Sequence, residues 1–225
     1  MRNRRPGGMV VVDTGTIDRH PDREAHLMSL MERAKNILLQ PKTEWPVIEK
    51  EQATTGSLYT GYIIPLALIT PVAQIIGWSV VGLRMPIIGG SIRWPIGIAV
   101  RNGIVVYVLS LVGVFVLALI IDALAPTFGG QKNQIQALKT AAYSYTAAWV
   151  GGIFNLIPSL ALLGLLALLY CFYLLFLGLP VLMKAPEDKA VGYTAVVIIV
   201  AIVLYFVIGA VVAQFAWRPG MMTGM

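Results

Sequence analysis

Long runs of uncharged, apolar residues constrain this chain more than any other feature. The clearest run, 103–121, contains 19 residues without a charge. A helix of that length extends about 28 Å, close to the roughly 30 Å hydrocarbon core of a bilayer. Backbone polar groups must be paired inside lipid, and a helix pairs them within itself. The sequence therefore predicts an all-α membrane protein.

Five such runs are predicted to be membrane-spanning helices, because glycine, proline or charged connectors separate them. They cover approximately residues 58–80, 103–121, 136–157, 160–183 and 191–215. We expect a five-transmembrane-helix bundle over 58–217, preceded by a disordered tail at 1–23 and followed by a flexible end at 218–225. The connector 81–102 is expected to be a loop along the membrane surface, and a re-entrant hairpin is the alternative.

The segment 24–57 is predicted to be an amphipathic interfacial segment before the first span. From Glu24 to Gln40 a helical period gathers six apolar side chains on one arc, and Pro41 ends the helix. The six are Leu27, Leu30, Met31, Ala34, Ile37 and Leu38. A juxtamembrane amphipathic helix on anionic phospholipid headgroups is the favoured interpretation. The alternative is a helix that packs on its own membrane domain or on a second subunit.

The distribution of positive charge predicts the orientation of the bundle. With the N-terminus inside, thirteen of the 17 lysine and arginine residues lie on the inner side. Cytoplasmic loops carry such an excess. We therefore expect a multi-pass protein of the plasma (inner) membrane with a cytoplasmic N-terminus and an exoplasmic C-terminus. The net charge of +6 is attributed to lipid headgroups, because basic residues do not cluster with aromatics as in nucleic-acid sites.

Two classes of residue in the apolar runs are candidates for contacts between helices. Polar side chains at intramembrane positions are Gln74, Tyr143, Tyr145 and Asn155, and small residues spaced four apart are Ala148 with Gly152 and Gly209 with Ala213. Lys139, in the first turn of the third span, is expected to extend to the membrane surface. Asn155 is expected to bond within the turn that joins the third span to the fourth.

Residue types that carry catalysis are sparse. Both histidines lie before the first span, and Cys171 is the single cysteine, which excludes an intramolecular disulfide and a multi-cysteine metal cage. No phosphate-binding glycine motif is present in the sequence. We therefore expect no enzyme activity, no cofactor and no metal.

Three stretches resemble bacterial members of the Yip family of Rab-interacting-like membrane proteins. They are RAKNILLQPKTEWPVIEKE (33–51), FGG (128–130) and LLYCFYLLFLGLPVLMKAPEDKAVGYT (168–194). The resemblance covers about 28–216 and implies five spans, a cytoplasmic N-terminus and a short exoplasmic C-terminus. The DLYGP-like pattern of the eukaryotic relatives is absent from the sequence, so GTPase binding is not carried over.

The function expected from these features is non-enzymatic. A membrane protein that organises membrane partners or lipids is the favoured hypothesis, with a membrane-protein partner or a homo-oligomer as its contacts. The alternative is a small oligomeric channel or carrier that lines its path with the polar intramembrane side chains.

Overall fold

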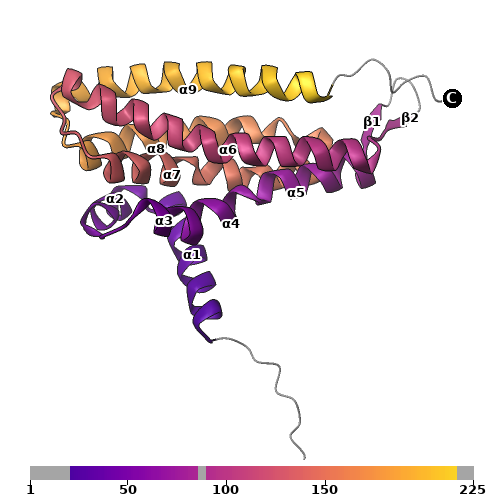
Figure 1. The fold of residues 1–225 in the computed structure, drawn as a ribbon, viewed down its shortest axis with the longest axis horizontal. Helices are drawn as coiled ribbons and strands as arrows, with labels where there is room; N and C mark the ends of the chain where they lie inside the picture. Colours follow the sequence, from indigo (N-terminus) through magenta and orange to yellow (C-terminus); the bar gives the residue numbers. More distant parts are fainter. Residues whose placement is uncertain (1–20, 86–89, 217–225) are drawn as a thin grey trace, which may run out of the picture.

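The protein is a bundle of helices that lie roughly side by side along one long axis (Figure 1). The structure, a computed structural model, describes residues 21–85 and 90–216. The helices are α1 (Pro21–Leu39), α2 (Pro41–Lys50), α3 (Thr55–Leu58), α4 (Ile64–Ala67), α5 (Ile69–Ile76), α6 (Ile96–Leu124), α7 (Gln134–Gly151), α8 (Leu163–Met183) and α9 (Glu187–Ala216). The π-helical segment Tyr59–Ile63 joins α3 to α4, and a second one, Gly77–Val81, extends α5, so that α3 to Val81 forms one irregular helix.

Within 21–85 and 90–216, four helical stretches are long and apolar enough to cross a membrane. They are Thr55–Val81, Ile96–Phe128, Leu163–Met183 and Glu187–Gln214. Each contains most or all of one predicted span, so the helical membrane architecture is confirmed. The predicted span at 136–157 corresponds to α7, which is not one of the four. The disordered tail predicted at 1–23 overlaps α1 at 21–23, and its remainder lies outside the described residues, as does the flexible end at 218–225.

Helix α7 lies inside the bundle and not at its lipid-facing surface. Twelve of its 18 residues are buried, and it contacts α1, the α3–α5 stretch, α6 and α8. Because neighbouring helices surround it, most hydroxyls and amides of α7 contact protein and need not face hydrocarbon. This position explains why its sequence is the least apolar of the five predicted spans.

The chain from α7 to α8 reverses direction as predicted, although not through a tight turn alone. Helix α7 ends at Gly151, before the predicted end of the span at 157. Two short 3₁₀ segments, Gly152–Leu156 and Pro158–Leu160, follow it. The two helices approach closely at Gly151, where an added Cβ would lie only 2.3 Å from Ala167 Cβ. The absence of a side chain at Gly151 therefore permits this antiparallel contact.

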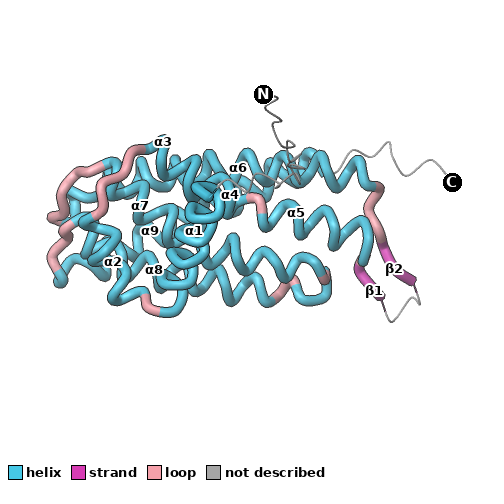
Figure 2. Tube along the Cα trace, turned by 90° about the horizontal axis from the view of Figure 1, so that it is seen from below, coloured by secondary structure: helices cyan, strands magenta, loops and turns pink. Residues whose placement is uncertain are grey.

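The prediction of a surface loop at 81–102 is wrong for residues 96–102, since α6 already begins at Ile96. Pro95 directly precedes this helix, and its fixed backbone conformation suits that place. Before it, β1 (Leu83–Met85) pairs antiparallel with β2 (Gly90–Ile92), with Leu83 opposite Ile92. Figure 2 shows this hairpin at one end of the bundle and α2 at the other. We call these the hairpin end and the α2 end.

Helix α1 extends sideways from the bundle near the α2 end (Figure 1). Of its predicted lipid-facing side chains, Ala34 and Ile37 are buried in the protein core, while Leu30 and Leu38 are partly buried against it. Met31 is 69% exposed, and Leu27 lies outside the described side chains. Much of this face therefore packs on the protein's own membrane domain, as in the alternative interpretation.

Candidate functional site

Helix α2 was not predicted, because Pro41 was interpreted only as the end of the preceding helix. Pro41 instead occupies the first turn of α2, where a missing N–H costs nothing. The helix buries Trp45 and Ile48 against the bundle. The Trp45 indole occupies the space left by Gly178 on α8, where an added Cβ would lie 2.7 Å from the ring. Apolar contacts therefore dock α2 onto α8.

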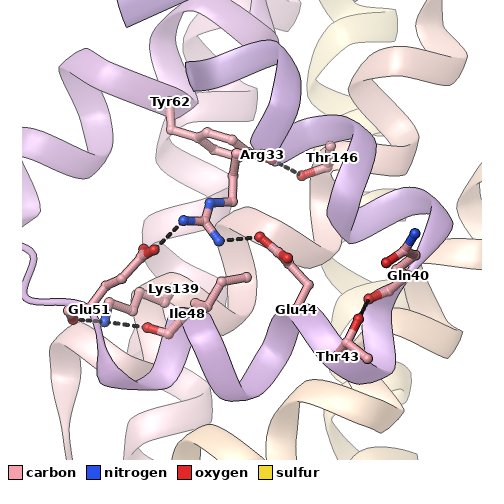
Figure 3. A network of polar contacts seen from close by, with 9 residues as sticks. All are labelled: Arg33, Gln40, Thr43, Glu44, Ile48, Glu51, Tyr62, Lys139 and Thr146. Carbon is pink, nitrogen blue, oxygen red and sulfur yellow. Dashed lines mark hydrogen bonds and ion pairs between the residues drawn. The ribbon is translucent and has the colours of Figure 1, made fainter. Parts of the chain in front are cut away.

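Arg33 of α1 joins both ends of α2 through ion pairs (Figure 3). Its guanidinium donates from Nη1 to Glu44 Oε1 and from Nη2 to Glu51 Oε1. Burial lowers the pKa of the Arg33 guanidinium, but the Glu51 and Glu44 carboxylates outweigh burial and hold this pKa above its ordinary value. The pairs are partly buried, so they are screened less than surface ion pairs.

Lys139 does not reach the surface of the protein, contrary to the expectation from sequence. This residue of α7 is buried in the protein. Its Nζ donates a 2.8 Å hydrogen bond to Ile48 O and another hydrogen bond to Glu51 O. These carbonyls lie at the C-terminus of α2, where helices leave acceptors unpaired and where positive charge is favoured. The ammonium group finds its acceptors inside the protein because α2 folds over it.

Two further contacts fix the same end of α2. Gln136 Nε2 donates to Glu49 O at 2.9 Å, and Lys184 Nζ lies 2.8 Å from Glu49 Oε1. The hydrogen bond from Lys184 holds the pKa of the Glu49 carboxyl below its ordinary value. We call the set formed by Arg33, Glu44, Glu49, Glu51, Gln136, Lys139 and Lys184 the α2 clamp.

Tyr143, predicted as a polar intramembrane residue, lies directly beneath α2. Its ring centroid is 4.5 Å from that of Tyr62 and 6.4 Å from that of Trp45. The Tyr62 hydroxyl is 2.7 Å from Thr146 Oγ1 (Figure 3). Tyr143 is therefore part of an aromatic cluster that supports the clamp.

The other predicted polar residues are not members of the α2 clamp. Gln74 lines a cavity at the hairpin end, and Tyr145 packs near Trp149 with ring centroids 6.1 Å apart. Asn155 donates from Nδ2 to Gly152 O at 2.9 Å, which confirms the expected bond within the turn. A Cβ added at Gly77, three residues after Gln74, would lie 1.9 Å from Asn155 O, so the turn that contains Asn155 packs on the end of the first spanning stretch.

The predicted small-residue pairs differ in their surroundings. A Cβ added at Gly152 would lie 2.0 Å from Thr70 Oγ1, so the chain after α7 meets α5 closely at this glycine. Ala148 is partly buried against the core. In contrast, a Cβ at Gly209 would meet nothing within 4 Å, and Ala213 is exposed. The second pair makes no close packing contact within the described chain.

The three stretches that carry the family resemblance meet at the α2 end. The first begins at Arg33 and ends at Glu51, and both residues belong to the clamp. In the second, Phe128 stacks on Tyr193 of the third, with ring centroids 5.1 Å apart. The third is also bonded to the first, since the Tyr170 hydroxyl donates to Leu38 O at 2.7 Å. The three stretches therefore contact one another and form a single packed region at the α2 end.

The chemistry of the α2 clamp is structural. Arg33 and Lys139 balance Glu44 and Glu51 in formal charge, and their polar atoms are bonded to one another or to backbone carbonyls. Among the described residues, no group of three or more histidine, cysteine, aspartate or glutamate side chains could hold a metal ion. The clamp fixes the position of α1 and α2 relative to the membrane domain.

Sequence reasoning missed this clamp although its charges were visible. No role is predicted from the sequence for Arg33, Glu44 or Glu51. A usable signal was the alternation of acidic and basic residues beside apolar Trp45 and Ile48 in 41–51. That pattern is typical of a short helix with one buried face.

Comparison with known proteins places these observations in a wider group. The family model described as the Yip1 domain matches residues 35–209. Inner membrane protein YohC of Escherichia coli strain K12 is 26% identical over 171 residues, which cover 73% of this chain and 86% of that protein. The YohC protein of E. coli O6:H1 matches equally well. No solved structure matches the chain.

Proposed function

The chain belongs to the Yip1 domain family, and from this premise we propose that it is a non-enzymatic, multi-pass inner-membrane protein that organises membrane partners or lipids through its α2 end. The observation that carries the proposal is the α2 clamp. Several buried or partly buried charged groups hold α1 and α2 in a fixed position, and such groups are costly unless fully bonded. A surface held in this way suits recognition.

The exposed side chains of α1 and α2 have the composition of a contact surface. Apolar Met31, Leu39 and Val47 are 69%, 68% and 48% exposed. Exposed lysines at positions 35, 42 and 50 accompany them on the same two helices. Apolar residues mixed with lysines suit anionic headgroups or an acidic partner at the membrane surface.

The proposal includes α7 as the fifth span and a cytoplasmic α2 end. Helix α7 is antiparallel to α8, and its neighbours supply the apolar surroundings that lipid supplies to the other spans. The excess of lysine and arginine on the side of α2 supports the cytoplasmic placement. The name of YohC places that relative in the inner membrane.

The experiment that tests this function is affinity purification of the tagged, full-length protein in mild detergent. Native mass spectrometry would then identify bound proteins and lipids. We expect a reproducible partner or an enriched anionic lipid, and we expect the double variant K42E/K50E to lose it while keeping the wild-type unfolding temperature. The matched control is K132E, at an exposed lysine outside α1 and α2. A preparation without any partner or enriched lipid contradicts the proposal.

A further inference from the structure

A small cavity lies at the hairpin end, remote from the α2 clamp. Its volume is about 150 Å³, and α5, α6, α9 and the segments on both sides of the hairpin contribute to its lining. Gln74, Trp78, Trp94, Asn102 and Val212 are among the lining residues. A water molecule occupies about 30 Å³ in the liquid, so the cavity has room for a group of a few heavy atoms.

Two amide oxygens make this cavity chemically unusual. Gln74 Oε1 and Asn102 Oδ1 are buried, and neither has a hydrogen-bond partner among the described residues. Asn102 is only 9% exposed. An unpaired buried acceptor is destabilising, so polar atoms at such positions are normally bonded. A ligand that donates hydrogen bonds to both oxygens would remove this cost.

Two tryptophans in the lining of the cavity can attract a positively charged ligand. Trp78 and Trp94 stack with ring centroids 4.9 Å apart, and Trp94 N donates to Trp78 O at 3.0 Å. This pairing joins the end of the first spanning stretch to the start of α6. The face of an indole ring attracts cations, including amines of ligands. Acceptor oxygens and indoles together suit an ammonium group with N–H donors.

The surroundings of the cavity indicate a lipid as the source of that ammonium group. Apolar side chains on the adjoining turns face outward, with Ile76, Val80 and Ile96 42%, 61% and 61% exposed. In a spanning helix such side chains contact acyl chains. Arg93, next to Trp94 in sequence, is exposed and supplies a cation for a phosphate.

We propose that the hairpin-end cavity binds the headgroup of an aminophospholipid of the phosphatidylethanolamine type. Gln74 Oε1 and Asn102 Oδ1 accept hydrogen bonds from its ammonium group, the indoles of Trp78 and Trp94 provide π surface beside the charge, and Arg93 pairs with its phosphate. This inference does not rest on the role proposed for the α2 end, because it uses a different cavity and different residues.

The test is lipid selectivity of the full-length protein in mixed micelles with equal amounts of phosphatidylethanolamine, phosphatidylcholine and phosphatidylglycerol. Native mass spectrometry measures the bound fraction of each lipid. We expect enrichment of phosphatidylethanolamine over phosphatidylcholine, whose quaternary ammonium has no N–H to donate. N102L and Q74L should each reduce that enrichment about tenfold, as for loss of a hydrogen bond to a charged group.

Two variants complete the design. N102D keeps an acceptor oxygen at the same place and should retain the enrichment, whereas Q131L makes the same amide-to-leucine change at an exposed position of the α2 end and should have no effect. Equal binding of the two lipids by the wild type, or undiminished enrichment in N102L, overturns the proposal.

A competition assay on the wild type protects the test against variants that fail to fold. Soluble phosphoethanolamine should displace a fluorescent phosphatidylethanolamine from the protein, and phosphocholine should not. Equal displacement by both compounds also overturns the proposal.

Discussion

Lys139 is stable inside the bundle because backbone carbonyls of α2 satisfy its ammonium group. K139M keeps the approximate length of the side chain but leaves Ile48 O and Glu51 O without this donor. Ile48 O keeps the Glu51 N–H as a donor at 3.3 Å, so Glu51 O is the acceptor that loses its donor, at a cost of about 1–3 kcal/mol. We expect the thermal unfolding midpoint in detergent to fall by roughly 2–12 °C, since about 1 kcal/mol corresponds to about 2–4 °C for a chain of this size.

The control for this prediction is K132M, which removes an exposed lysine before α7. Its midpoint should remain within about 1 °C of the wild type, as surface changes seldom exceed about 0.5 kcal/mol. Equal midpoints for K139M and the wild type would mean that Lys139 does not hold α2 in solution.

The Glu49–Lys184 pair makes stability depend on pH in a defined direction. The Glu49 pKa is lower in the folded protein than its ordinary value of 4.5. Its stabilising effect is therefore fully present above that value and is lost as the pH falls through the lower, folded pKa. Unfolding midpoints measured from pH 7 to pH 3 should show a larger loss for the wild type than for E49Q. Parallel curves would exclude a folded-state role for this carboxylate.

Contact between the first spanning stretch and the end of α7 depends on Gly152. G152A would place a Cβ 2.0 Å from Thr70 Oγ1 and 2.9 Å from Thr70 Cα, so backbone must move. Overpacking of this kind costs about 1–3 kcal/mol, and we expect a lower unfolding midpoint in detergent.

Gly209 provides the matched control, because a Cβ there meets no atom within 4 Å. G209A should leave the midpoint unchanged or raise it slightly, since alanine favours a helix by up to about 1 kcal/mol over glycine. A destabilised G209A would instead indicate that this face packs against another molecule.

Helix positions could be predicted from sequence where hydrophobicity alone decides them. The first span, predicted at 58–80, lies within Thr55–Val81, and the last, predicted at 191–215, lies within α9. The start of α6 could not be predicted in this way, because the charged Arg101 interrupts the apolar residues after the helix has already begun at Ile96. Charge marks the membrane boundary, and a helix can continue past that boundary.

The α2 clamp was beyond sequence reasoning for a different reason. Arg33, Glu51 and Lys139 are distant in the chain, and only the docking of α2 onto α8, next to α1, brings them together. Of the predicted polar residues, Tyr143 lies at this site, where its ring contacts Trp45 of α2. Gln74 lies at the opposite end of the bundle. Periodicity predicts which residues share a helix face, but it does not predict which helices meet.

The two ends of the whole molecule should be accessible from opposite sides of the membrane. Lys42 at the α2 end and Arg93 beside the hairpin are both exposed. The native Cys171 is 2% exposed and should not react. With a membrane-impermeant maleimide, we expect R93C to be labelled in intact cells or spheroplasts and K42C only after permeabilisation. Labelling of both from the same side would contradict a bundle that crosses the membrane along its long axis.

The interior position of α7 has a consequence for biosynthesis. A helix that carries Lys139 and several amides and hydroxyls gains little free energy by leaving the translocation machinery for lipid alone. Its stable location exists only once α8, made later by the ribosome, is available to pair with it. The two segments should therefore enter the membrane together as a hairpin, and a nascent chain stopped before α8 should leave α7 outside the lipid.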